Sequence, residues 1–143
     1  DGAAAVLVTT LDRARREGWP VLCELVSSAA VGCDPTVMGI GPVPAVRSAL
    51  AKANIGLEAI DLVEINEAFA PQFLAVEKDL GLDRAKTNVH GGAIALGHPL
   101  GASGTRITLH LALAIARGEA TTAVGSACIG GGQGIAVVLR KVG

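Results

Sequence analysis

Residues 120–142 read ATTAVGSACIGGGQGIAVVLRKV, two apolar runs separated by the glycine-rich turn IGGGQ. Each run has the length and composition of a buried strand. Because so short a connection allows only a hairpin, we predict that the two strands are antiparallel. The mostly apolar segment before them, from about Ala102 to Arg117, predicts a helix. The face of this helix that packs on the sheet should hold Ile107, Leu111, Ala114 and Ile115.

The rest of the chain alternates strand-like and helix-like segments. Apolar runs at Ala3–Val8, 20–32 and 60–66 predict three further strands. Residues 11–18 predict a short helix, and two longer helices should begin near Pro44 and Pro71. Residues 34–44 hold three prolines and two glycines, which predicts a loop. This order predicts an α/β layered fold with a mixed five-stranded sheet.

Composition excludes several classes of protein. Half of the 143 residues are hydrophobic, yet only two Phe and one Trp are aromatic, and the net charge is −1. A near-neutral chain without stacking platforms is a poor nucleic-acid binder, and one so apolar is not disordered. The longest mostly apolar run, 107–116, is too short to cross a bilayer. Three cysteines without C-x-x-C spacing favour a reducing, intracellular setting over a disulfide framework or a zinc site.

The first residues do not look like a natural start. The chain opens at Asp1 and runs directly into an apolar segment, with no initiator methionine and no signal sequence. The sequence therefore suggests a fragment whose first strand belongs to a larger sheet.

Three polar clusters lie at the ends of predicted strands or within the glycine-rich loop 88–104. They contain Asn66, His98 and Cys128. Because ligands of α/β sheets bind beyond the carboxyl ends of strands, we expect these side chains to meet in one shallow site. Glycines there let backbone N–H groups face a developing negative charge and favour a thiolate, and a histidine exchanges protons near neutral pH. The plainer alternative is that Cys128 is a small core residue and that the glycines only form turns. We interpret Cys23 and Cys33 as core residues of this kind.

Two other histidines, His90 and His110, are interpreted as structural. The glycine spacing at 97–104 matches neither the dinucleotide-binding fingerprint nor the P-loop, which argues against nucleotide binding through those motifs.

Three blocks of sequence resemble one family. NEAFA (66–70), GGAIALGHPLGASG (91–104) and CIGGGQG (128–134) are similar, in order and spacing, to the C-terminal signatures of thiolases. The resemblance covers essentially the whole chain and is nearest to 3-ketoacyl-CoA thiolases, with acetoacetyl-CoA thiolases as near relatives. It implies an acyltransferase of fatty acid metabolism and β-oxidation that cleaves a 3-ketoacyl-CoA with CoA, or runs the reverse Claisen condensation. Coenzyme A thioesters would be substrates, and no cofactor is implied.

The resemblance also implies a role for each motif residue. His98 would activate a nucleophilic cysteine and bind the thioester oxygen of the second substrate, and Asn66 would hold a water at the same oxyanion site. Cys128 would be the general acid/base that removes the α-proton. The N–H of Gly130 would contribute to a second oxyanion hole, and Phe69 would line the pantetheine tunnel.

Two departures qualify the resemblance. His90 stands where family members usually have asparagine, and neither Cys23 nor Cys33 lies in a block like the family's nucleophile motif. We therefore expect residues 1–18 to be the last strand and helix of the N-terminal thiolase half, and 19–143 to be the C-terminal domain. The expected partners are acyl-CoA, CoA and the missing N-terminal half, in a homodimer or tetramer located in the bacterial cytoplasm or in mitochondria. By itself the chain should be inactive.

Two other interpretations stay open. One is a stand-alone domain that binds CoA or a partner without catalysis, although such a scaffold has no need of His98, Cys128 and Asn66. The other is a ketosynthase-like condensing enzyme, which is disfavoured because those proteins typically carry His or Asn at the position of Cys128.

Overall fold

The computed structural model describes all 143 residues and is built on one mixed sheet of four strands. The strands are β1 (Glu24–Gly32), β2 (Leu62–Ile65), β3 (Thr122–Ile129) and β4 (Gln133–Arg140), and their order across the sheet is β1-β4-β3-β2. β3 and β4 form the predicted antiparallel hairpin, β1 pairs antiparallel with β4, and β2 runs parallel to β3. The prediction of a mixed sheet is confirmed.

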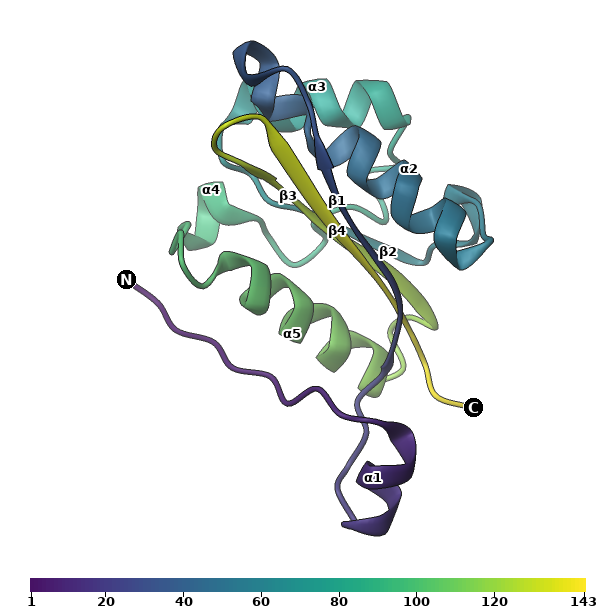
Figure 1. Cartoon of the computed structure of the whole chain (residues 1–143). Helices are drawn as coiled ribbons and strands as arrows, with labels where there is room; N and C mark the ends of the chain where they lie inside the picture. The colour runs from purple at the N-terminus through teal and green to yellow at the C-terminus, as the bar shows by residue number, and fades with distance from the viewer.

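Helices cover both faces of this sheet (Figure 1). α2 (Pro42–Ala53) and α3 (Ala70–Leu80) lie on one face, and α5 (Ser103–Ala116) lies on the other. Shorter turns of helix connect these elements: α1 (Leu11–Arg16), η1 (Pro35–Ile40), η2 (Leu57–Ala59) and α4 (Ala93–Leu96). The prolines near the starts of α2 and α3 explain where these helices begin, because proline suits the first turn, where its missing N–H has no partner to lose.

Two layers of apolar side chains hold the helices to the sheet. Val46, Ala49 and Leu50 of α2 pack with strand residues that include Val124 and Val138. On the opposite face, α5 buries its predicted side against the sheet, which confirms the packing of this helix; the buried residues are Ile107, Leu111, Ala114 and Ile115. Alternate residues of a strand point to opposite faces, so even-numbered residues of β3 face α2 and odd-numbered ones face α5.

The prediction of a strand at Ala3–Val8, which would have been the fifth strand of the sheet, was wrong. This segment is extended but pairs with no strand, and Leu7 and Val8 are 74% and 73% exposed. It runs alongside α5, away from both edge strands of the sheet (Figure 1). A short apolar run has the composition of a strand, but it becomes one only where a neighbouring strand offers hydrogen-bonding groups. The short helix that follows was predicted correctly and appears as α1.

The predicted loop 34–44 is more ordered than its proline content suggested. It contains the 3-10 helix η1 and the start of α2. Gly41, at the junction of the two, packs backbone to backbone on Gly134 of β4, and a Cβ at either position would collide with the other glycine or its neighbour. This close approach fixes η1 against the end of the β3–β4 hairpin.

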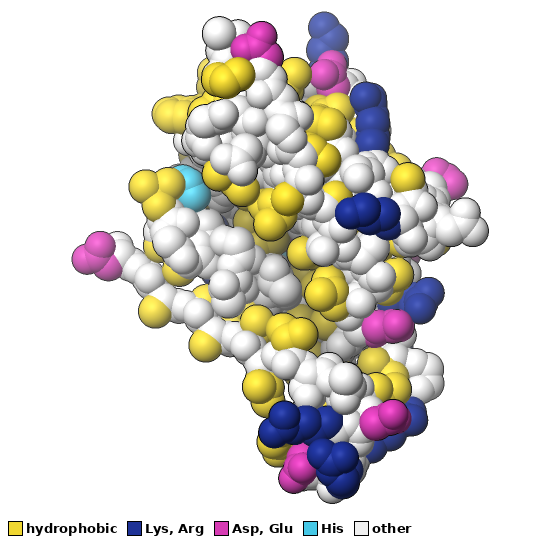
Figure 2. Space-filling model, in the orientation of Figure 1, with side chains coloured by type: hydrophobic (Ala, Val, Ile, Leu, Met, Phe, Trp, Pro, Cys, Tyr) yellow, Lys and Arg dark blue, Asp and Glu magenta, His cyan; other side chains and the backbone are white.

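Hydrophobic and basic side chains gather on different parts of the surface. Hydrophobic side chains follow the extended N-terminal segment, and basic side chains gather around α1 (Figure 2). The side chain of Ala14 is the only one that α1 buries, and the guanidinium of Arg13 lies over the Trp19 ring at 5.5 Å from its centre. None of the helices has the length and apolar character needed to cross a membrane.

Candidate active site

The three predicted site residues lie along the edge of the sheet where β2 and β3 end. Because these strands are parallel, with Ile65 opposite Ser126, their carboxyl ends meet at the same edge. Asn66 follows β2 directly, and its backbone N–H donates to the carbonyl of Ser126 at 2.9 Å. Cys128 lies two residues further along β3.

Asn66 and His98 are in direct contact. Asn66 is 2% exposed, and its Nδ2 lies 3.4 Å from His98 Nε2. The other ring nitrogen, His98 Nδ1, is 2.7 Å from the hydroxyl of Ser103, which is also 2% exposed and opens α5. A row of three polar side chains therefore runs from the end of β2 to the start of α5, with the imidazole in the middle.

A second set of contacts holds the loop that carries His98. Asn88 adopts the left-handed conformation (φ 49°), and its side chain bonds both the N–H and the C=O of Ile65 at 2.9 Å. Glu67 accepts from Asn88 Nδ2 and from the N–H of Ile94, each at 3.0 Å. A Cβ on Gly92 would overlap the Glu67 carboxylate, so a glycine is needed for this contact. The loop before His98 is thus tied to the end of β2.

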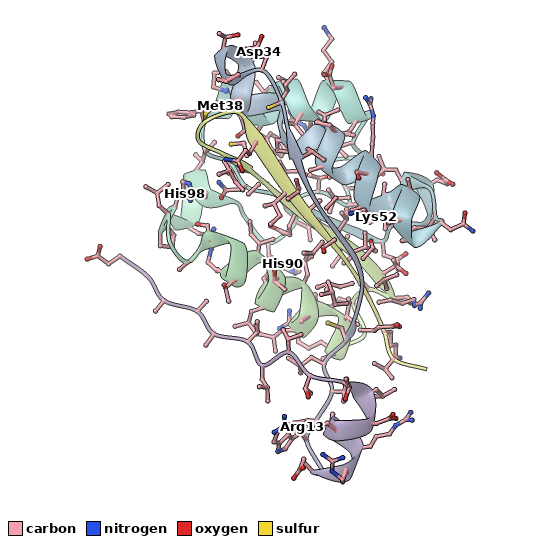
Figure 3. The ribbon with its side chains drawn as sticks, viewed as in Figure 1. Arg13, Asp34, Met38, Lys52, His90 and His98 are labelled. Carbon is pink, nitrogen blue, oxygen red and sulfur yellow. The ribbon has the colours of Figure 1, made fainter.

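Cys128 approaches the same edge from the other face of the sheet. By strand alternation it lies with Val124 on the α2 side, whereas Asn66 lies with Glu64 on the α5 side. The side chain of His98 contacts Asn66 and Ser103, and no hydrogen bond joins the Cys128 thiol to Asn66 or His98. Figure 3 shows His98 at the end of the molecule where Met38 and the β3–β4 turn lie. The convergence of all three side chains stays a prediction.

The expected lowering of the Cys128 pKa was wrong. Burial raises the pKa of this thiol, its own backbone lowers it by less, and the neighbouring Cys33 raises it further. The thiol is half-buried, and desolvation penalises the charged thiolate more than backbone dipoles favour it. A substrate must therefore meet a protonated thiol at neutral pH, or supply groups that favour the thiolate.

The two remaining predicted residues are exposed. Phe69, which precedes α3, is 66% exposed, and Gly130 lies in the β3–β4 turn, where its carbonyl accepts from Gln133 Nε2 at 3.4 Å. Gly132 in the same turn has a φ of 87°, and a Cβ there would come within 2.5 Å of the carbonyl oxygen of Cys33. The turn thus packs closely on the segment that follows β1. The roles of Phe69 and Gly130 stay predictions.

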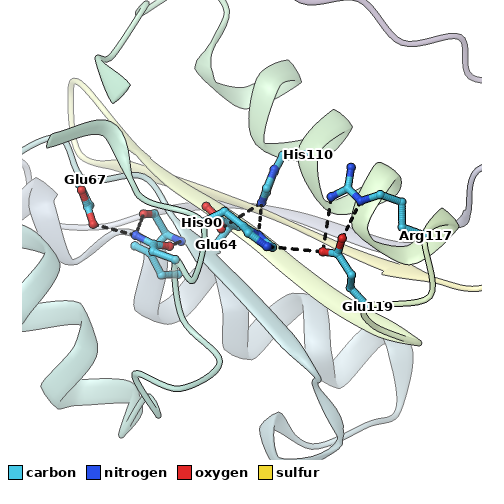
Figure 4. Close-up of polar contacts among 8 residues, drawn as sticks. Glu64, Glu67, His90, His110, Arg117 and Glu119 are labelled. Atoms are coloured by element: carbon cyan, nitrogen blue, oxygen red, sulfur yellow. Dashed lines mark hydrogen bonds and ion pairs between the residues drawn. The ribbon is translucent and has the colours of Figure 1, made fainter. Parts of the chain in front are cut away.

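His90 and His110 lie outside this row of side chains, in a chain of titratable groups (Figure 4). His110 Nε2 is 3.5 Å from the Glu64 carboxylate and 3.3 Å from His90 Nδ1, and His90 in turn reaches Glu119 at 3.6 Å. Glu119 is also paired with Arg117. Burial raises the pKa of Glu64 to about 7, Arg106 partly opposes the shift, and Glu67 adds to it. Burial, followed by the charge of His90, lowers the pKa of His110.

This chain of groups predicts a pH-dependent stability for the variant Glu64→Gln. In the folded chain Glu64 keeps a proton that the unfolded chain releases above the ordinary pKa of 4.5. The contribution of this carboxyl to the free energy of unfolding is therefore lost as the pH rises through about 7. Glu64→Gln should therefore change the free energy of unfolding little near pH 4.5 and raise it above pH 7 by up to about 3 kcal/mol. Denaturant titrations of both proteins across this range measure the difference.

His110 acts in the opposite direction, because its lowered pKa destabilises the fold as the pH falls below its ordinary value of 6.5. Because His110 Nε2 lies 3.5 Å from the Glu64 carboxylate, the two contributions are coupled, and the proteins are compared above pH 7, where the lowered pKa leaves His110 neutral. Glu58→Gln, at an exposed carboxyl, serves as the control and should give a flat difference. An equally flat difference for Glu64→Gln would contradict the prediction.

The fold and the site define a layered α/β domain with an amide, an imidazole and a thiol along the carboxyl edge of its sheet. The chain belongs to the thiolase family: the model of the thiolase C-terminal domain matches residues 19–141. Two curated relatives are the human mitochondrial 3-ketoacyl-CoA thiolase, 58% identical over 141 residues, and the acetyl-CoA acetyltransferase of Pseudomonas aeruginosa, 53% identical over 141 residues. Both alignments cover 99% of this chain and 36% of the relative.

A solved structure agrees with this assignment. The crystal structure of human mitochondrial 3-ketoacyl-CoA thiolase in complex with CoA superposes with a TM-score of 0.90 at 57% identity, over 93% of this chain and 34% of that one. The expected family and its layered fold are confirmed. The chain spans about a third of the length of the relatives it matches.

Ser103, Glu67 and Asn88 support the site but were not predicted to have roles in it. A serine at the start of a helix is usually interpreted as a cap. In the sequence, only the five-residue separation between Ser103 and His98 indicated a contact. Glu67 stood beside Asn66 in the predicted polar cluster, but its contacts to Asn88 and Ile94, 21 and 27 residues away, depend on the tertiary fold.

Proposed function

We propose that this chain supplies the general acid/base and one oxyanion site of a thiolase that cleaves 3-ketoacyl-CoA with CoA, or catalyses the reverse condensation of two acyl-CoA thioesters. The observation that carries this proposal is the contact of Asn66 with His98 beside the end of β3, within a family whose named members are thiolases and acetyl-CoA acetyltransferases. The subclass is proposed from the identity to 3-ketoacyl-CoA thiolases.

His98 and Asn66 would act together on the thioester oxygen. The imidazole exchanges a proton with the nucleophilic cysteine, and Asn66 holds the water that completes the oxyanion site. Asn66 Oδ1 is buried and has no hydrogen-bond partner within the chain, and such an acceptor is suited to hold a bridging water. Preorganised donors of this kind stabilise an enolate or tetrahedral oxyanion by about 3–4 kcal/mol each.

Cys128 would remove the α-proton of the second thioester as its general base and return it in the reverse direction. Its raised pKa makes its thiolate a stronger base, although less of the thiol is ionised at neutral pH. The N–H of Gly130 would complete the second oxyanion hole, and the exposed ring of Phe69 would contact the pantetheine chain.

The proposal extends to ligands, partners and location. We propose acyl-CoA and CoA as ligands, because a matching structure was solved in complex with CoA. The proposal requires no cofactor, since the chemistry is acid–base and nucleophilic. It includes a nucleophile-bearing N-terminal half and a homodimer or tetramer. A location in mitochondria or the bacterial cytoplasm is proposed from the names and sources of the relatives.

A chimera tests the proposal. The 141 aligned residues replace the matching segment of the human mitochondrial thiolase, and the loss of acetoacetyl-CoA in the presence of CoA is followed. The chimera should turn over substrate, His98→Gln should abolish turnover, and His90→Asn, at a histidine outside the site, should retain it. A folded chimera that binds CoA without turnover would favour the non-catalytic binding domain instead.

A further inference from the structure

We propose that Ser103 is a positioning residue that holds the neutral ring of His98 with its proton on Nδ1, so that the Nε2 lone pair faces the edge of the sheet. The inference deepens the proposed function, in which Nε2 takes the proton of a thiol. It rests on the row of side chains from Asn66 through His98 to Ser103 and the carbonyl of Pro99.

The direction of the hydrogen bonds starts at Asn66. Its Nδ2 always carries hydrogens, so its contact with His98 Nε2 at 3.4 Å requires that nitrogen to accept. A neutral imidazole has one donor and one acceptor nitrogen, so the proton lies on Nδ1. Nδ1 then donates to Ser103 Oγ at 2.7 Å, and the hydroxyl passes its own hydrogen to the Pro99 carbonyl at 3.1 Å. Each of the three contacts in the row then pairs one donor with one acceptor.

The reverse direction leaves unpaired groups that cost more. If Nε2 carried the proton, Asn66 would have to turn its carbonyl toward it, and the Nδ2 group with its two donors would take the buried place that Oδ1 now occupies. Unpaired buried N–H groups are rarer in proteins than carbonyl oxygens with a missing partner. The observed direction leaves Oδ1 and one Nδ2 hydrogen without a partner, and this costs less than leaving both Nδ2 hydrogens unpaired.

Ser103 is well placed to impose this choice. It is 2% exposed, and its own backbone N–H also donates to the Pro99 carbonyl at 2.8 Å, so the hydroxyl is fixed by the first turn of α5. In the proposed reaction the thiol proton moves to Nε2 and leaves a thiolate and an imidazolium. As Nε2 takes the proton it gives up the hydrogen bond from Asn66 Nδ2, whereas the imidazolium keeps its Nδ1–H on Ser103.

The tautomer can be read directly from the full chain without substrate. Two-bond ¹H–¹⁵N correlations of ¹⁵N-labelled protein at a pH of about 8.5, where an ordinary imidazole is neutral, distinguish protonated from unprotonated ring nitrogens. His98→Gln identifies the His98 signals among those of the three histidines. We expect a protonated Nδ1 and an unprotonated Nε2.

The variants separate positioning from folding. Ser103→Ala should shift His98 toward the Nε2–H form, and Ser103→Thr, which keeps the hydroxyl, should restore Nδ1–H. Thr108→Ala is the matched control, because Thr108 Oγ1 also donates to a carbonyl one turn back on α5, Gly104 at 2.8 Å, and it should leave the tautomer unchanged.

A wild-type ring protonated on Nε2, or an unchanged tautomer in folded Ser103→Ala, would overturn the inference. Should Ser103→Ala not fold, a wild-type ring protonated on Nε2 would still overturn the inference. Because no substrate is present, this outcome is independent of whether the chimera has thiolase activity.

Discussion

Replacing Cys128 with serine in the thiolase chimera is expected to abolish condensation and α-proton exchange while leaving transfer of an acyl group onto the nucleophilic cysteine intact. A serine hydroxyl is far less acidic than a thiol and gives almost no alkoxide, so the base is lost. Loss of a general base typically costs 10²- to 10⁴-fold in rate, and we expect an effect at about the upper end. The first half-reaction uses His98 and a different cysteine, so it should proceed.

Single-turnover measurements separate the two steps. Acyl transfer is measured as the amount of labelled acetyl group that becomes bound to the protein. Exchange of the α-proton is measured as deuterium incorporated into acetyl-CoA. Cys23→Ser is the matched control, because this half-buried thiol packs against the α5 side of the core, at the start of β1 and away from the carboxyl edge. Equal losses in both steps for Cys128→Ser would show that Cys128 has another role.

The 143 residues by themselves are expected to show no turnover of acetoacetyl-CoA with CoA. Thiolysis needs a nucleophile to carry the acyl group between two substrates. The candidate residues supply a base and parts of two oxyanion holes, and Cys128 would have to act as nucleophile and base in the same cycle. The rate should therefore lie at background, against about 1–10³ per second for an ordinary enzyme.

Loss of the ketoacyl-CoA absorbance measures this turnover, and the chimera provides the positive control under the same conditions. Exposed apolar side chains of the N-terminal segment, such as Leu7 and Val8 at 74% and 73%, favour self-association, so the assay is paired with size-exclusion chromatography. Turnover by the isolated chain within the ordinary enzymatic range would refute the prediction.

Local patterns predicted the central elements of the fold. The IGGGQ turn between two apolar runs allowed only a hairpin, and the periodic apolar residues of 102–117 identified the buried face of α5. They failed for Ala3–Val8, because composition records how apolar a segment is and not whether another strand lies within hydrogen-bonding distance. Strand count is a tertiary property, and the sequence of one segment does not contain it.

Local patterns also predicted part of the site. Asn66 and His98 stand out as polar residues beside strand ends and glycines, and they do meet. Their supports, Ser103 and the pair of Glu67 with Asn88, are recognisable only when distant segments are brought together. Burial raises the pKa of Cys128. The glycine-rich motif indicated only the opposing effect of backbone dipoles, so the sequence predicted a shift in the wrong direction.

The order of the strands has a consequence for how the chain folds. β4, the last of the four strands along the chain, lies between β1 and β3, and Glu24 of β1 faces Arg140 of β4 across a separation of 116 residues. β1 therefore has no hydrogen-bonding neighbour in the sheet until β4 has been synthesised. Closing so long a loop is entropically costly, and sheets with such distant pairings fold slowly. We expect β1 to be the last strand to acquire protection against amide hydrogen exchange during refolding, after the β3–β4 hairpin.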